Sequence, residues 1–85
     1  LQGLLIRPAI PSDWEHYEVK RVYRGCELHI YVENPSHVQN GVIAMSLNGE
    51  DVDISAGAYI TEEMLKNQTK VHITVTMGNA EEGGK

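Results

Sequence analysis

Two segments of the chain alternate strictly between hydrophobic and polar residues, and both predict half-buried β-strands. In the first, 26–33, the residues expected to face inward are Cys26, Leu28, Ile30 and Val32. In the second, 71–77, they are Val71, Ile73, Val75 and Met77. A period of two means that one face of each strand is buried and the other is exposed to solvent. The residues between them are expected to be more exposed, among them His29, Tyr31, His72 and Thr74.

Weaker alternation predicts further strands on either side of the first segment. Residues 17–24 form one, with Tyr17, Val19, Arg21 and Tyr23 on a common face, and Gly25 allows a tight turn after it. Asn34-Pro35 ends the next strand, and a new inward set follows at Ile43, Met45 and Leu47. Asn48-Gly49 predicts a hairpin, because a type I′ turn needs positive φ at both positions. Val52 and Ile54 are expected to continue the return strand.

The remaining segments complete a small all-β domain. Residues 3–6 are apolar, and Pro8 and Pro11 favour an extended lead-in toward Trp14 rather than a central strand. At most one short helix is expected, near 61–67. Short strands with turn signals every 8–12 residues or so predict a small antiparallel β-sandwich, jelly-roll-like, over residues 1–78. The polar, glycine-rich residues 79–85 are expected to form a flexible tail.

Composition and charge narrow the classes of function. The chain has 85 residues, which is one domain, and its net charge of −5 argues against a nucleic-acid partner. No apolar run approaches the ~20 residues of a membrane span, so no membrane contact is expected. The single cysteine, Cys26, cannot form an intrachain disulfide, which favours a reducing, cytoplasmic location. Because the chain begins at Leu1 rather than methionine, we expect it to be a piece of a longer protein.

Two pairs of side chains could carry chemistry, and each also has a plain structural interpretation. His29 and His72 could share a metal if their strands were neighbours, but no cysteine or carboxylate stands at ligand spacing, so exposed strand histidines are expected. Asp51 and Asp53 share a face and could act as acid and base or bind calcium. No calcium-loop pattern surrounds them, so solvated carboxylates at a sheet edge are expected.

Three further residues are functional candidates. Trp14 and Tyr17 could form a platform on which a sugar stacks, but a lone tryptophan more often packs in the core or at an interface. Cys26 would need an activating histidine to be a nucleophile, and a small buried residue is expected instead. The chain also lacks a G-x-S-x-G motif and a phosphate-binding glycine loop. We therefore expect no catalytic, cofactor-binding or metal-binding residue in it.

Residues 8–42 resemble the C-terminal domain of glycoside hydrolase family 94, which includes cellobiose and chitobiose phosphorylases and cyclic β-1,2-glucan synthases. The motifs that carry the resemblance are P-x-I-P-x-x-W at 8–14, Tyr23-Arg24-Gly25, E-N-P-x-x-V at 33–38 and Gly41-Val42. Asn48-Gly49 fits the family's next hairpin, and 71–78 is similar to its closing strand. The chain departs from the family pattern at Arg7, Ala9 and Cys26, and 59–70 match poorly.

The resemblance implies a non-catalytic role for this domain. In such enzymes a preceding (α/α)₆ barrel carries out inverting phosphorolysis of a carbohydrate, with an aspartate as general acid and inorganic phosphate as nucleophile. Those residues and the phosphate site lie outside this chain, so none can be carried over to it. The residues expected to have structural or interdomain roles are Pro8, Pro11, Trp14, Arg24 and Gly25.

The lead-in is expected to pack at the boundary with that barrel. Leu4 to Ile6 with Trp14 would leave apolar surface exposed in the isolated chain, which also leaves a homodimer open. Alternatively, the lead-in is an ordinary edge strand and Trp14 is fully internal. At the level of the whole protein, a phosphorylase is preferred over a glucan synthase because nothing suggests a membrane. A free-standing carbohydrate-binding or adhesion sandwich is the alternative from another class.

Overall fold

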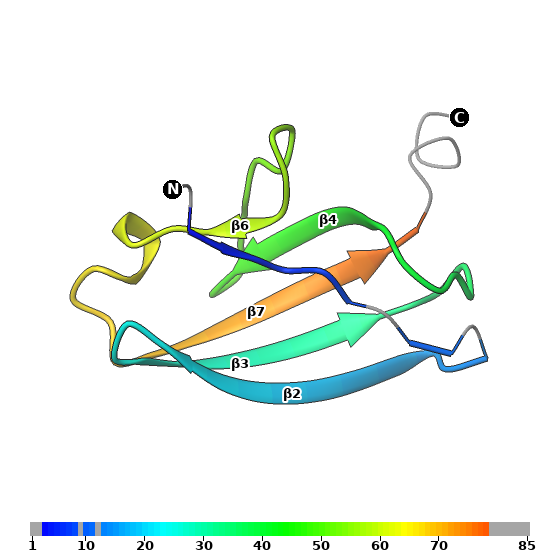
Figure 1. Cartoon of the computed structure of the whole chain (residues 1–85), viewed down its shortest axis with the longest axis horizontal. Helices are drawn as coiled ribbons and strands as arrows, with labels where there is room; N and C mark the ends of the chain where they lie inside the picture. The colour runs from blue at the N-terminus through cyan, green and yellow to red at the C-terminus, as the bar shows by residue number, and fades with distance from the viewer. Residues whose placement is uncertain (1–2, 9, 12, 79–85) are drawn as a thin grey trace.

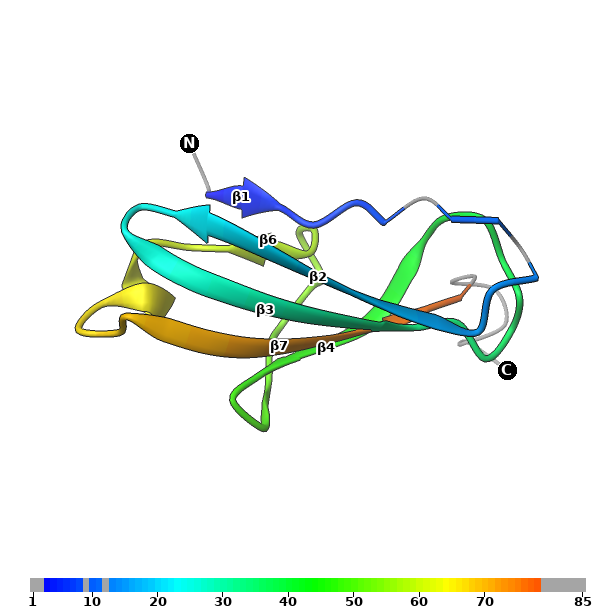
Figure 2. The same cartoon turned by 90° about the horizontal axis from the view of Figure 1, so that it is seen from below.

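The chain folds into two β-sheets that pack as a small sandwich (Figures 1 and 2), as the sequence predicts. The computed structural model describes residues 3–8, 10–11 and 13–78. The strands are β1 (Leu4–Leu5), β2 (His16–Tyr23), β3 (Cys26–Glu33), β4 (Val42–Leu47), β5 (Glu50–Asp51), β6 (Tyr59–Ile60) and β7 (Lys70–Met77). A single 3₁₀ turn, η1 (Glu63–Leu65), occupies the place of the expected short helix. The predicted tail, 79–85, lies outside the described residues.

The larger sheet has five strands in the order β2-β3-β7-β4-β5, and the smaller one pairs β1 with β6. One pairing differs from the expected antiparallel sandwich, because β3 and β7 run parallel, with Leu28 opposite Val71 and Ile30 opposite Ile73. Parallel neighbours need a long crossover connection. Here residues 34–69 supply it, since this segment contains β4, β5, the second layer's β6 and η1 before β7 begins.

Both predicted tight turns are present. Arg24 and Gly25 have φ values of 52° and 77°, and Asn48 and Gly49 have 52° and 89°. Positive φ at both central residues gives the twist that joins antiparallel strands directly. The return strand after Asn48-Gly49 is shorter than predicted, because β5 ends at Asp51. Val52 and Ile54 follow it in a loop and still pack partly buried against the core.

The core lies between the two sheets, and the alternating strands supply most of it. The inward residues predicted for β3 and β7 are all buried, and Met45 joins them from β4 while Leu47 is half-buried. Ile60, Leu65 and Ile6 close the core from the other layer. Ile43 was predicted to face inward, but it is 37% exposed. A β-bulge between Val42 and Ala44 inserts one residue and breaks the period of two there.

β2 is an edge strand of the larger sheet, and its inner face is only partly covered. Its residues Tyr17, Val19, Arg21 and Tyr23 lie opposite inward residues of β3, so the predicted common face is confirmed. The second layer has only two short strands and leaves much of this face uncovered (Figure 2). Val19 is consequently 39% exposed although it lies opposite buried Ile30.

Candidate functional site

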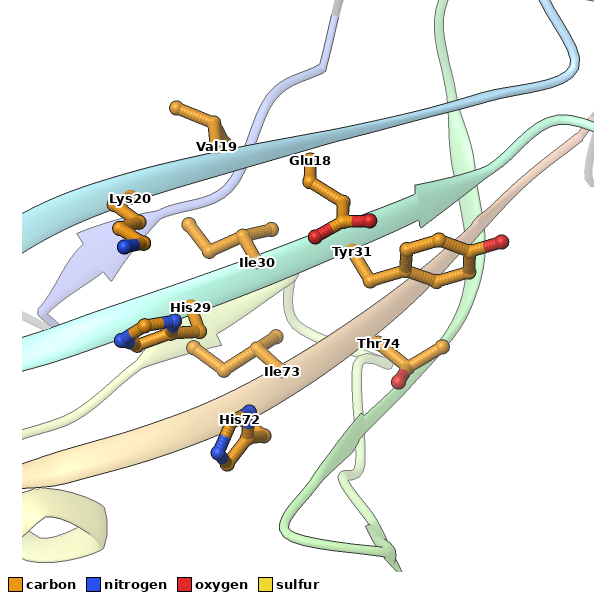
Figure 3. Close-up of a pocket in the computed structure, with 9 residues that line it drawn as sticks. All are labelled: Glu18, Val19, Lys20, His29, Ile30, Tyr31, His72, Ile73 and Thr74. Carbon is orange, nitrogen blue, oxygen red and sulfur yellow. The ribbon is translucent and has the colours of Figure 1, made fainter.

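The outer face of the larger sheet carries a shallow groove, which we call the outer groove. It has a volume of about 360 Å³ and crosses β2, β3 and β7. Figure 3 shows its polar side chains on the three neighbouring strands: Glu18, Lys20, His29, Tyr31, His72 and Thr74. The ring of Tyr31 stacks on that of His16 at a centroid distance of 5.8 Å. The groove therefore presents aromatic rings, one carboxylate, one ammonium group and neutral hydrogen-bonding side chains.

The two strand histidines do come together in this groove. β3 and β7 place His29 directly opposite His72, and their ring centroids are 5.2 Å apart. The Glu27 carboxylate lies 2.7 Å from Nε2 of His29, and this hydrogen bond lowers the pKa of Glu27. Nevertheless, no group of three or more potential metal ligands occurs among the described residues. The pair therefore consists of two imidazole rings in contact, of which His29 is also hydrogen-bonded to Glu27.

The two aspartates separate into different roles. Asp51 belongs to β5 and lies opposite Ser46, whereas Asp53 lies in the following loop. One oxygen of Asp53 accepts a hydrogen bond from the Ser55 backbone N–H at 2.9 Å. This bond lowers the pKa of Asp53 by stabilising its charged form. Asp53 therefore acts as a turn-forming carboxylate, a local pattern typical of Asx turns.

Cys26 faces the core and is 1% exposed, as the alternating pattern predicts. Its Sγ lies 3.9 Å from the Glu27 carbonyl oxygen. A thiol in this position packs as a small apolar side chain.

Asn34 organises the end of β3, although the sequence marked it only as the residue at which the strand stops and as part of the E-N-P-x-x-V motif. Its side chain is fully buried, and its Nδ2 donates to the carbonyls of Trp14 at 3.1 Å and Val38 at 2.8 Å. Its Oδ1 accepts from the Val38 N–H at 3.0 Å. The Asn34 backbone N–H also donates to the Glu15 carbonyl at 2.6 Å. This one residue therefore joins the lead-in to the loop after β3.

Trp14 projects from the lead-in and is 50% exposed, so the alternative of a fully internal tryptophan is wrong. Its ring meets that of Tyr17 edge to face at a centroid distance of 6.3 Å. Partial burial raises the pKa of the Tyr17 phenol. Of the two prolines in the lead-in, Pro8 is buried and Pro11 is exposed, and the Pro11 carbonyl accepts a hydrogen bond from the Trp14 N–H at 3.1 Å. We call Pro11, Trp14 and Tyr17 the Trp14 surface.

The rest of the lead-in is less exposed than the Trp14 surface. Leu4 and Leu5 form β1 against β6, and both are half-buried. Ile6 belongs to the core, and its N–H donates to the Ala58 carbonyl at 2.8 Å. The start of the lead-in thus forms an edge strand, and among the described residues of the lead-in the large exposed apolar side chain is that of Trp14.

Arg24, a predicted structural residue, ties the β2–β3 turn to the 3₁₀ turn. Its guanidinium forms an ion pair with Glu62 and lies over the Tyr23 ring, with Cζ 5.5 Å from the centroid. Both side chains of the ion pair are largely exposed, so its contribution to stability is small. Gly25 completes the turn in a conformation that favours glycine.

Comparison with known proteins gives the chain its context. No family model matches it. It is 52% identical over 50 residues to N,N'-diacetylchitobiose phosphorylase of Vibrio proteolyticus, a segment that is 59% of this chain and 6% of that protein. It is 44% identical over 48 residues to 3-O-beta-D-glucopyranosyl-beta-D-glucuronide phosphorylase of Paenibacillus borealis, or 56% of this chain and 6% of that protein.

A third relative is also named as a phosphorylase. Solabiose phosphorylase of Paenibacillus borealis is 38% identical over 50 residues, 59% of this chain and 6% of that protein. The chain is therefore related in sequence to carbohydrate phosphorylases, as the resemblance implied, and the matched segment spans only 6% of their length. In the part of the chain that the structure describes, no helix is long and apolar enough to cross a membrane.

Proposed function

We propose that this chain is the non-catalytic C-terminal β-sandwich domain of a glycoside hydrolase family 94 phosphorylase. The observation that supports the proposal is that 50 residues of this chain are 52% identical to a phosphorylase. The matched segment makes up only 6% of that phosphorylase. A domain that forms so small a part of its relatives leaves room for a separate catalytic domain. In this proposal a preceding (α/α)₆ barrel holds the general acid, inorganic phosphate and the β-linked disaccharide. A glucan synthase is less favoured, because the relatives reported above are named as phosphorylases.

The proposed role is to pack against the barrel through the Trp14 surface. Trp14 is the only tryptophan of the sequence, and the other aromatic residues of the Phe, Trp and Tyr types are four tyrosines. Half of the surface area of Trp14 is exposed to solvent, so a large apolar side chain remains uncovered in the isolated chain. The Trp14 carbonyl accepts a hydrogen bond from the Asn34 side chain, and its ring contacts the Tyr17 ring edge to face. A large aromatic side chain of this kind is typical of the centre of an interface. Residues 13–15 are then covered in the full-length protein.

Hydrogen–deuterium exchange tests this packing. We expect the amides around Trp14 to exchange roughly tenfold more slowly in the full-length protein than in the isolated chain, because docking restricts their opening. The Trp14→Ala variant of the full-length protein should lose much of that protection. Val22→Ala is the matched control, since Val22 is 73% exposed on the opposite face of the sheet. Equal exchange around Trp14 in the isolated chain and the full-length protein would rule out docking through this surface.

A further inference from the structure

The outer groove contains a row of three basic side chains that crosses three neighbouring strands (Figure 3). His29 on β3 lies opposite Lys20 on β2 and opposite His72 on β7. The ring centroids of the two histidines are 5.2 Å apart. We call these three residues the basic row. An imidazole donates one hydrogen bond when neutral and two when protonated, and an ammonium group donates three, so the basic row can bind an oxyanion.

The charges around the basic row favour an anion over a metal ion. Lys20 forms no ion pair with any residue that the structure describes. Its positive charge lies in the same row as both imidazoles and therefore repels a metal cation. The Glu27 carboxylate is hydrogen-bonded to Nε2 of His29 at 2.7 Å, and the ammonium groups of Lys20 and Lys70 partly offset its negative charge.

A second row of polar side chains lies beside the basic row in the same groove (Figure 3). Tyr31 on β3 lies opposite Glu18 on β2 and opposite Thr74 on β7, and we call these three residues the polar row. Each lies two residues along its strand from a member of the basic row, which corresponds to about 7 Å. The Glu18 carboxylate accepts hydrogen bonds, and the hydroxyl groups of Tyr31 and Thr74 can donate and accept them. A complementary ligand therefore carries an oxyanion and, about 7 Å away, hydroxyl groups.

We propose that the outer groove binds a phosphorylated monosaccharide, with its phosphate on the basic row and its hydroxyl groups on the polar row. A phosphate monoester has three strong acceptor oxygens, one for each member of the basic row. The groove volume of about 360 Å³ lies within the range of about 300–1,000 Å³ that is typical of small-molecule sites. This inference does not rest on the proposed phosphorylase assignment, because it uses side chains on the outer face of the sheet and not the Trp14 surface.

NMR titrations of the isotopically labelled 85-residue chain test the ligand class, with glucose 6-phosphate, inorganic phosphate and glucose as separate probes. Glucose 6-phosphate should shift the amide and imidazole signals of the basic row and saturate with a dissociation constant of about 1 mM or below. Inorganic phosphate has no hydroxyl groups for the polar row, and glucose has no oxyanion for the basic row. Each should therefore bind at least about tenfold more weakly.

Variants of the two rows separate their roles. Lys20→Gln and His72→Gln each remove a donor to the phosphate and should weaken binding of glucose 6-phosphate at least about fivefold. Glu18→Ala removes both an acceptor for the sugar hydroxyls and a negative charge. It should therefore weaken binding of glucose 6-phosphate but leave binding of inorganic phosphate unchanged or strengthen it.

The controls separate this site from general electrostatics and from misfolding. Lys66→Gln makes the same change in charge outside the groove and should leave the dissociation constant unchanged. Circular dichroism should show the same fold for all variants, because Glu18, Lys20 and His72 are exposed. The proposal would be overturned if glucose 6-phosphate gave no saturable shift up to about 10 mM. Equal affinity for inorganic phosphate and glucose 6-phosphate, or unchanged affinity in both Lys20→Gln and His72→Gln, would overturn it as well.

Discussion

Replacing Leu28 or Ile73 by alanine is expected to lower the free energy of unfolding by roughly 2–5 kcal/mol. Leu28 is 0% exposed and Ile73 is 1% exposed, and they lie on the neighbouring central strands β3 and β7. Alanine would leave a cavity where both layers meet. A small domain has a total stability of only about 5–15 kcal/mol, so either variant removes a large part of it.

Urea unfolding followed by circular dichroism measures this loss. Val22→Ala is the control and should change the free energy of unfolding by no more than about 0.5 kcal/mol, because Val22 is 73% exposed. Losses below about 1 kcal/mol at both Leu28 and Ile73 would mean that the faces of β3 and β7 are assigned the wrong way round.

Asn34→Ala is expected to cost roughly 2–4 kcal/mol, although it removes no apolar contact of the core. The change leaves three backbone groups without the partner that Asn34 supplies: the carbonyls of Trp14 and Val38, and the Val38 N–H. An unpaired buried group costs about 1–3 kcal/mol, and water entering the loop would offset part of that sum. The lead-in should also loosen, because the link from Asn34 to Trp14 is lost.

The same unfolding experiment, with Asn40→Ala as the matched control, tests this role. Asn40 is exposed in the same loop, so its replacement should have little effect. Near-equal stability of the two variants would show that the buried amide does not hold the lead-in in place.

The strands and their inward faces could be predicted from the sequence because alternation records burial directly. The residues of β3 and β7 illustrate this, since every predicted inward residue there is buried. Alternation does not record which strand lies beside which, and the parallel β3–β7 pair depends on a crossover through 34–69. Nor does it record a bulge, which is why Ile43 was placed on the wrong face.

The candidate site could be predicted less well, because it depends on contacts between distant residues. Asn34 contacts Trp14, 20 positions away, and only the folded chain brings these residues together. The E-N-P-x-x-V motif was the available signal, since it holds both Asn34 and Val38. The exposure of Trp14, 50%, is likewise set by how the lead-in packs in the folded chain, and it leaves no local pattern in the sequence.

Phosphorolysis assayed side by side in the full-length protein and the isolated 85-residue chain tests whether catalysis requires the rest of the protein. The substrates are β-linked disaccharides with inorganic phosphate, and the product measured is sugar 1-phosphate. We expect release by the full-length protein and none by the isolated chain, because the proposed function places the general acid and the phosphate site in the preceding barrel. Release of sugar 1-phosphate by the purified 85-residue chain, or none by a folded full-length protein with any of these disaccharides, would contradict the proposed non-catalytic role.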